Sequence, residues 1–357
     1  MNRHEKALKI LHNGTVIPAI PLVLNRNREF DLPLQRRLVR YYLEAGAGGV
    51  AAAVHTTQFE IRDPKYGLLR PVLEAVAEEL DDYEKGSEVP PVRIAGVCGE
   101  TSQACREALL AKELGYDAVL LSPGGLNHLS EAEMLYRTEK VADIMPVIGF
   151  CLQNAVGGRR FSFSYWKQLA DIPNVVAVKS APFNRYQTLD LVRGCAASSR
   201  GDEVALYTGN DDNIVFDLLT PFRFGDQGEQ KVKYFAGGLL GHWCVWTRKV
   251  VELFHTIKAC QGKESIPAEL LTLGAQITDC NGAFFDAAND FHGCIPGVHE
   301  VLRRQGLMEG IWCLNPEETL SEGQLQEIDR VYRMYPELND DKFVQEYLTG
   351  RNRKDQV

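Results

Sequence analysis

Eight short apolar runs recur along the first 240 residues, and they constrain the fold more than any other feature of the sequence. Each run has the length and composition of a buried strand, and segments with helical periodicity lie between them. This alternation predicts parallel β–α–β units, and eight units in about 250 residues predict a (β/α)8 TIM barrel. The runs are residues 15–22, 48–54, 92–98, 118–122, 146–152, 175–181, 204–208 and 234–240.

A doubly wound open sheet is the other architecture compatible with alternating strands and helices. Such a sheet usually carries a G-x-G-x-x-G loop after its first strand, where it binds a nucleotide. Residues 25–28, which follow the first apolar run, read Asn-Arg-Asn-Arg and contain no glycine. The barrel is therefore the favoured prediction.

Helical periodicity is clearest in residues 32–45, 66–80, 102–114, 131–144 and 245–261. Two of these segments begin with helix-start signals. Asp31 precedes a proline in the first turn, and Ser130 and Glu133 have capping-box spacing.

Two segments, one just before the eighth apolar run and one after it, depart from the alternation of strands and helices. The polar stretch 220–233, just before that run, is long for a barrel loop and is interpreted as an insertion. From about residue 265 the strand pattern ends and helical patterns take over. We therefore expect a barrel carrying the active site in residues 1–262 and a C-terminal helical appendage in residues 263–357.

Composition narrows the range of partners. The formal net charge is −9, and no basic cluster is interleaved with aromatic residues, so neither nucleic acid nor an anionic membrane is expected as a partner.

The nine cysteines are scattered and form no C-x-x-C pair, as is typical of free thiols in a reducing compartment. No H-E-x-x-H motif is present, so no metal or other cofactor is expected. Without a secretory signal or a membrane-spanning apolar stretch, we expect a cytoplasmic protein.

Lys179 is the residue with the strongest chemical signal. It lies inside the apolar run Val-Val-Ala-Val-Lys-Ser-Ala, which is predicted to be the sixth strand. A buried amine has a lowered pKa and becomes a nucleophile that can form a Schiff base with a carbonyl substrate. The alternative is a lysine at a strand end whose ammonium group reaches water.

Polar residues follow several predicted strands in a fixed order. Residues 54–60 read Val-His-Thr-Thr-Gln-Phe-Glu, Lys179 comes about 120 residues later, and residues 209–212 and 237–239 read Gly-Asn-Asp-Asp and Gly-Gly-Leu. In this order and spacing the chain resembles the dihydrodipicolinate synthase and N-acetylneuraminate lyase family of class I, pyruvate-handling aldolases. The corresponding family elements are a Gly-Thr-Thr-Gly-Glu loop, a Schiff-base lysine, a Ser-Gly-Asp-Asp turn and a glycine-led eighth strand.

The resemblance implies a barrel in which Lys179 forms a Schiff base with a 2-oxo acid, and a homo-oligomer that is a dimer or tetramer. It also implies a catalytic role for Thr56. The substrate-binding positions that it implies are Gly209, Asn210, Gly238 and Leu239.

Thr56 and Thr57 also make chemical sense as a carboxylate site. Together they offer two hydroxyl groups and two backbone N–H groups in succession, a suitable cradle for the carboxylate of a 2-oxo acid. The alternative is a turn in which the hydroxyls bond to nearby backbone groups. Because Lys179 lies at the spacing from these threonines that the family shows, the carboxylate cradle is the favoured interpretation.

The chain departs from the family at its proton-transfer residues. Family members use a tyrosine on the fifth strand as general acid/base, and here that position holds Phe150 or Cys151. The synthase's second relay tyrosine falls at Gly124 or Gly125. Cys151 is retained as a candidate acid/base, with an inert buried thiol as the alternative.

Three further residues are candidates for substrate binding. Arg159 follows the fifth strand, where the synthase has an arginine that binds the second substrate's carboxylate. His55 and His242 are predicted to lie on the barrel rim, where they could bind a hydroxylated substrate or handle protons. Asp211 and Asp212 are interpreted as helix caps only.

Two functions remain open from the sequence. The first is a Schiff-base lyase, an aldolase or dehydratase, acting on a small 2-oxo acid such as pyruvate or a 2-oxo-3-deoxy sugar acid. The second is a barrel that has lost turnover and binds an oxo acid or sugar acid as a sensor or assembly partner. Because both relay phenols are missing, we expect little condensation of pyruvate with aspartate semialdehyde.

Overall fold

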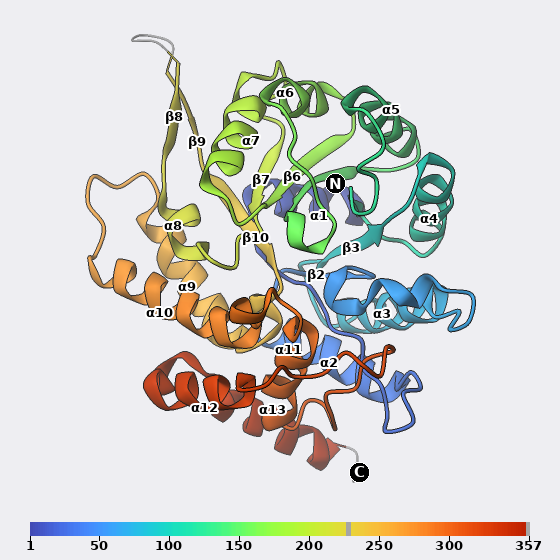
Figure 1. Cartoon of the computed structure of the whole chain (residues 1–357), viewed down its shortest axis with the longest axis vertical. Coiled ribbons are helices and arrows are strands. Elements are labelled where there is room, and N and C mark those ends of the chain that lie inside the picture. The colour runs from blue at the N-terminus through green and yellow to red at the C-terminus, as the bar shows by residue number, and fades with distance from the viewer. Residues whose placement is uncertain (226–229, 355–357) are drawn as a thin grey trace.

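The computed structural model describes residues 1–225 and 230–354, and eight parallel strands form its centre (Figure 1). Each predicted apolar run contains one of them. They are β1 (Val16–Pro18), β2 (Gly49–Ala52), β3 (Val92–Val97), β4 (Ala118–Leu121), β5 (Val147–Leu152), β6 (Val175–Ala181), β7 (Ala205–Thr208) and β10 (Phe235–Leu240).

The sheet closes on itself. Its strand order is β1-β10-β7-β6-β5-β4-β3-β2, so the two ends of the order are β1 and β2. A parallel bridge between Ala19 and Ala51 joins these ends, and the Ile20 N–H donates to Ala51 O at 2.9 Å. The predicted (β/α)8 TIM barrel is confirmed.

Helices cover the outside of the barrel, and the five predicted helical segments are among them. Asp31 accepts a hydrogen bond from the Leu34 N–H, and Ser130 forms a capping box with Glu133, so both predicted helix starts are confirmed. The helices are α2 (Leu32–Glu44), α3 (Leu69–Glu84), α4 (Thr101–Glu113), α5 (Glu131–Ala142), α6 (Phe163–Asp171), α7 (Arg185–Ala197), α8 (Ile214–Leu219) and α9 (Thr247–Cys260).

Two apolar layers pack against the strands. The outer layer lies between the strands and the helices, and the inner layer fills the barrel. Because successive residues of a strand face opposite sides, Phe150 packs on the inner layer whereas Cys151 belongs to the outer one. Phe150 is in register with Lys179 on the neighbouring strand, so the lysine also faces the interior.

Helix α1 (Arg3–Asn13) was not predicted, and it closes the amino-terminal end of the barrel. Its Ala7 and Leu11 are buried in the inner layer, and the Tyr207 hydroxyl donates to Leu11 O at 2.7 Å. The helix covers apolar side chains that would otherwise meet water at this end.

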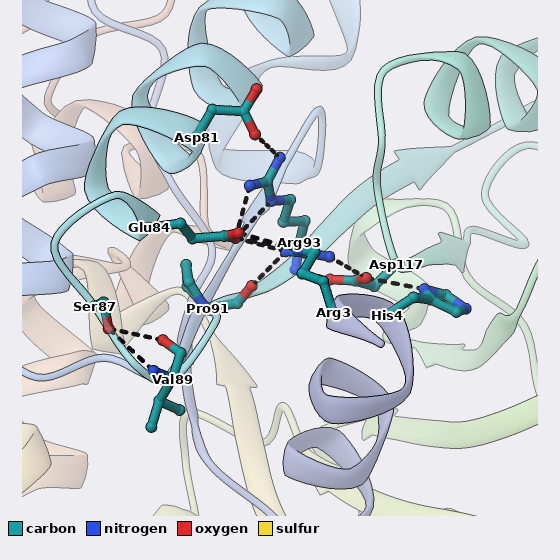
Figure 2. Close-up of polar contacts among 9 residues, drawn as sticks. All are labelled: Arg3, His4, Asp81, Glu84, Ser87, Val89, Pro91, Arg93 and Asp117. Atoms are coloured by element: carbon teal, nitrogen blue, oxygen red, sulfur yellow. Dashed lines mark hydrogen bonds and ion pairs between the residues drawn. The ribbon is translucent and has the colours of Figure 1, made fainter. Parts of the chain in front are cut away.

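Charged residues hold α1 in place (Figure 2). Arg3 pairs with Glu84 at 2.9 Å and also with Asp117, and it donates to Pro91 O at 2.8 Å. Asp117 is almost fully buried just before β4, and it also accepts from the Arg93 N–H at 3.0 Å. The network thus joins α1 to the loops that precede β3 and β4.

The predicted insertion contains a short antiparallel hairpin. Its strands are β8 (Phe222–Phe224) and β9 (Lys231–Lys233), and they project beyond the helices of the barrel (Figure 1). Residues 226–229 of the predicted insertion lie outside the described part of the chain.

The chain after α9 is helical, and its described residues contain no strand. It comprises α10 (Glu269–Phe284), α11 (Cys294–Arg304), α12 (Gln324–Met334) and α13 (Asp341–Lys354). These helices pack beside α2 and α9 (Figure 1). The Tyr41 hydroxyl of α2 donates to Asp340 at 2.6 Å, and the Tyr347 hydroxyl donates to Arg37 O at 2.8 Å. Among the described residues, no helix has both the length and the apolar character needed to span a membrane.

Candidate active site

A cavity of about 90 Å³ lies at the carboxyl ends of the barrel strands. Residues at the ends of β2, β3, β5, β6 and β7 contribute to its wall, together with residues of the C-terminal helical region. One buried water needs roughly 10–15 Å³ of such space, so the cavity has room for a small organic molecule. Active sites of TIM barrels lie at this end of the strands.

Lys179 enters the cavity from β6 and is 8% exposed. Its Nζ lies 4.5 Å from the centroid of the Phe150 ring. Burial lowers the pKa of Lys179 to about 8, and the nearby Asp211 carboxylate opposes this effect. A substantial fraction of the amine is therefore neutral near pH 7 to 8, as a nucleophile requires.

Gly209 provides the space that Lys179 needs. It lines the cavity directly after β7, and a Cβ at this position would lie 2.3 Å from Lys179 Cε and 2.8 Å from Ala181 Cβ. Its role in the structure is to let the lysine side chain pass. The substrate-binding role that the resemblance implied for Gly209 stays a prediction.

Asp211 also lines the cavity, although the sequence pattern suggested only a helix cap. Its Oδ1 accepts from the His242 N–H at 2.9 Å, and its backbone carbonyl accepts from the Asn281 side chain at 2.6 Å. Burial raises the pKa of Asp211 to about 7. The signal that could have identified it is its place after β7, at the same barrel end as Lys179.

Cys151 does not face the cavity, which corrects the prediction that it is a candidate acid/base. It lies in the outer apolar layer, and burial raises the pKa of its thiol well above the usual range. Phe150 occupies the inward position instead. No tyrosine is among the described residues that line the cavity.

Thr56 and Thr57 follow β2 in a short 3₁₀ helix, η1 (His55–Thr57). Thr56 lines the cavity, but its hydroxyl donates to Ala19 O at 2.6 Å. Thr57 is fully buried outside the cavity wall, and its hydroxyl donates to Ile20 O at 2.7 Å. The Thr57 N–H donates to Val54 O. Three of the four donors of the predicted carboxylate cradle are therefore bonded within the protein, and Thr57 has the position of a structural residue.

The two predicted rim histidines lie in different places. His55 lines the cavity, where burial and the Lys179 charge lower its pKa to about 4. His242 is not part of this wall, and it lines a second cavity of about 310 Å³ between α8, α9 and α10. Its backbone N–H binds Asp211, so its contribution to the site is indirect.

Arg159 and Asn210 have partners elsewhere and do not line the cavity. The Arg159 guanidinium donates to Leu129 O and lies 5.3 Å from the centroid of the Phe161 ring. Asn210 is fully buried, and its side chain donates to Asp217 at 2.8 Å. The substrate-binding roles predicted for these two side chains are not supported by their positions.

Gly238 and Leu239 of β10 also lie outside the cavity wall. A Cβ at Gly238 would meet the Trp243 ring at 2.5 Å, so the glycine permits close packing of the chain that follows β10. Leu239 is fully buried in the inner apolar layer. Both residues support the barrel below the site and do not bound the cavity.

The C-terminal helical region completes the cavity, which the sequence did not indicate. Phe285 and Phe291 line it from the segment between α10 and α11, and Cys294 lines it as the first residue of α11. The Phe291 ring contacts Phe183, which follows β6, with centroids 5.7 Å apart. These residues are about 100 positions away from the β6 loop in the sequence, so no local pattern connects them.

Among the described residues, no group of three or more His, Cys, Asp or Glu side chains could hold a metal ion. The closed barrel and the buried lysine at the carboxyl ends of its strands define a TIM-barrel protein with a candidate amine nucleophile.

Comparison with known proteins gives the family. A sequence profile of the dihydrodipicolinate synthetase family matches residues 12–228, more than half of the chain. N-acetylneuraminate lyase 2 of Escherichia coli O6:H1 is 22% identical over 319 residues, which cover 88% of this chain and 92% of the relative. The 4-hydroxy-tetrahydrodipicolinate synthase of Desulforudis audaxviator is 27% identical over 218 residues, which cover 58% of this chain and 66% of the relative.

Among solved structures, the dihydrodipicolinate synthase of Acinetobacter baumannii complexed with pyruvate is similar, with a TM-score of 0.71 and 19% identity. The match covers 90% of this chain and 98% of the synthase. The chain belongs to the dihydrodipicolinate synthetase family, and it shares the fold of that family's lyases.

Proposed function

We propose that the protein is a lyase in which Lys179 forms a Schiff base with a small 2-oxo acid such as pyruvate. The observation that carries the proposal is the buried amine of Lys179 in a cavity at the catalytic end of the barrel, with a pKa lowered to about 8. The family match and the pyruvate complex of the Acinetobacter baumannii relative support the same substrate class.

The chemistry follows from a neutral amine next to a carbonyl carbon. Lys179 Nζ adds to C2 of the 2-oxo acid, and water leaves to form an iminium ion. When the bond between C3 and C4 of a 4-hydroxy-2-oxo acid breaks, the iminium accepts its electron pair and an aldehyde departs. The resulting enamine is protonated at C3 and hydrolysed, which releases pyruvate and the free lysine.

Asp211 is the group that we assign to proton transfer in this reaction. Cleavage requires a base for the C4 hydroxyl proton, and the described residues that line the cavity include neither a tyrosine nor Cys151. Asp211 lines the cavity with a pKa of about 7, which suits a group that gains and loses a proton near neutral pH. The His242 N–H binds Oδ1 and thereby orients the carboxyl group.

Reductive trapping tests the proposed nucleophile. Incubation with pyruvate and borohydride should add one reduced pyruvyl group per chain, and peptide mapping should place it on Lys179. Lys179→Met should abolish the adduct, because methionine keeps an unbranched apolar side chain but has no amine.

Lys258→Ala is the matched control for this experiment. Burial also lowers the pKa of Lys258, but its ammonium group bonds to Asn13 O and Ala236 O, away from the cavity. The control variant should retain the full adduct. If the unmodified protein forms no adduct with pyruvate or with a panel of other 2-oxo acids, the Schiff-base proposal is wrong.

A further inference from the structure

Phenylalanine rings form part of the wall of the cavity around Lys179. Five of its described lining residues are phenylalanines, and they come from four separate parts of the chain: Phe59, Phe150, Phe183, Phe285 and Phe291. The Phe183 and Phe291 rings meet at an interplanar angle of 69°, close to the edge-to-face geometry that aromatic rings prefer. An aromatic ring of a bound molecule would therefore contact both the faces and the edges of these phenylalanine rings.

The described wall of the cavity contains no second cationic side chain. Lys179 is the only lysine or arginine that lines it within the described part of the chain. Two arginines that follow β2 and β6 are paired elsewhere, Arg62 with Glu107 at 3.1 Å and Arg185 with Asp217 at 2.5 Å. The iminium charge on Lys179 would remain beside the carboxylate of the 2-oxo acid itself. A second carboxylate would therefore be buried without a partner, which is unfavourable.

The wall is also poor in groups that recognise a polyhydroxy chain. The Thr56 hydroxyl already donates to Ala19 O, and Asp211 is needed for proton transfer. Ser122 and Gln153 are the remaining hydroxyl and amide side chains that line the described cavity. A sugar acid would bury several hydroxyl groups against phenylalanine rings, and each hydroxyl without a partner weakens binding.

Some residues of the same wall have a left-handed backbone conformation. Ala53, Phe183 and Phe291 have φ values of 58°, 50° and 67°, and all three line the cavity. Residues other than glycine rarely adopt this left-handed backbone conformation, and it persists where the surrounding structure enforces it. The strained backbone fixes where the Phe183 and Phe291 rings are presented, so the shape of this wall is specified by the fold.

From these observations we infer the substrate class: a 4-hydroxy-2-oxo acid whose C4 substituent is an aromatic ring or a similar uncharged apolar group. The inference rests on the proposed Schiff-base function and specifies the aldehyde that leaves. Cleavage of such a substrate releases pyruvate and an aromatic aldehyde.

Three matched substrates test the inference because all of them yield pyruvate on cleavage. They are 4-hydroxy-2-oxo-4-phenylbutanoate, 4-hydroxy-2-oxoglutarate and 4,5,6-trihydroxy-2-oxohexanoate, which carry a phenyl, a carboxylate and a polyol at C4. Pyruvate is measured with lactate dehydrogenase and NADH. We expect kcat/KM for the phenyl substrate to exceed that for each of the others by at least tenfold.

The outcomes separate this inference from the proposed function. If pyruvate is trapped on Lys179 but the polyol or the carboxylate substrate is cleaved as well as the phenyl substrate, the inference is wrong and the proposed function stands. If no 2-oxo acid is trapped and none is cleaved, the proposed function fails and the inference fails with it.

Variants of the wall provide a second test. Phe291→Ala and Phe183→Ala should lower kcat/KM for the phenyl substrate about tenfold more than they lower the rate of pyruvate trapping. Phe224→Ala, on the remote β8 strand, should change neither quantity. Equal losses of both quantities in the wall variants would mean that these rings only maintain the fold, and would overturn the inference.

Discussion

Lys179 and Asp211 share one cavity, and burial acts on them in opposite directions. It lowers the pKa of the amine to about 8 and raises the pKa of the carboxyl group to about 7. Both changes favour the neutral form, because a charge in a poorly hydrated cavity loses solvation. The charge of each group also acts on the other, so the two groups titrate as a pair.

The proposed reaction predicts different pH dependences for turnover and for trapping. Cleavage needs the neutral amine of Lys179 and the ionised carboxylate of Asp211, so turnover should rise with pH through both ionisations and reach a plateau above about pH 8. Pyruvate trapping needs only the neutral amine, so it should depend on one ionisation and fall less steeply on the acid side. A turnover profile that follows the trapping profile over the whole range would contradict the need for a second titrating group.

Asp211→Asn should separate the two steps. Loss of the proton-transfer group should lower turnover by about 10²- to 10⁴-fold. Trapping at pH 7 should be unchanged or faster, because the Asp211 charge raises the pKa of Lys179. Asparagine still accepts from the His242 N–H, so the loop should keep its structure. Equal losses of turnover and trapping would instead indicate a structural role for Asp211.

Thr57→Val should affect folding more than the reaction. The substitution removes the hydroxyl that donates to Ile20 O and accepts from the Val54 N–H, and it leaves both buried backbone groups without that partner. We expect a loss of about 1–3 kcal/mol in the free energy of unfolding, measured with urea, and little change in pyruvate trapping. A large loss of trapping with little change in the free energy of unfolding would instead indicate that Thr57 binds the substrate.

Strand pairing explains which residue of the fifth strand reaches the site. Phe150 and Lys179 are paired in register on β5 and β6, so their side chains lie side by side on the inner face. Cys151, one residue later, must face the helices. The sequence alone left Phe150 and Cys151 as alternatives, because the register of β5 against β6 decides between them.

Helix α1 contributes to stability through a few buried polar contacts. The Asp117 side chain is 1% exposed, and Arg3 supplies one of its partners. Arg3→Ala should lower the free energy of unfolding by about 1–3 kcal/mol, because the buried carboxylate loses a charged partner. Lys6→Ala, at an exposed position of the same helix, should change it little. A urea titration that gives equal effects for both variants would show that the Arg3 network does not stabilise the helix.

At the scale of the whole molecule, the C-terminal helices are part of the site as well as of the core. They supply Phe285, Phe291 and Cys294 to the cavity. The buried side chain of Asn281 on α10 holds the backbone of the loop that carries Asp211. We therefore propose that the C-terminal helical region and the barrel act together as one catalytic unit, whereas the sequence suggested a barrel that carries the site by itself.

His299 makes the docking of this region sensitive to acid. It is fully buried on α11, and burial lowers its pKa from 6.5 to about 4. Between these values the unfolded chain binds a proton that the folded protein does not, so the contribution of His299 to stability is present above about pH 6.5 and is lost as the pH falls towards 4. The difference between the two pKa values corresponds to about 3 kcal/mol in the free energy of unfolding.

His299→Leu should reduce the acid sensitivity of folding by up to about 3 kcal/mol between pH 7 and 4. Urea titrations at several pH values in this range measure the effect. His292→Leu, at an exposed position of the same region, is the control and should leave the pH dependence unchanged. An unaltered pH dependence in the His299 variant would contradict the prediction.

The sequence alone determined the barrel, its eight strands and the lysine at its catalytic end. Strand runs, helix caps and the apolar run around Lys179 are local patterns. Such patterns can be recognised in the sequence without knowledge of long-range contacts. The family resemblance then left Phe150 or Cys151 at the position of the missing phenol, and it implied a substrate-binding role for Gly209.

Only the tertiary structure decided which side chains meet at that lysine. It turned Cys151 and Arg159 away from the cavity, bonded the Thr57 hydroxyl to Ile20 O and placed Asp211 at the cavity wall. It also brought Phe285 and Phe291 to the cavity from the C-terminal region. The physical reason is that hydrogen-bond partners and cavity walls depend on contacts between residues far apart in the chain, and no local spacing encodes those contacts.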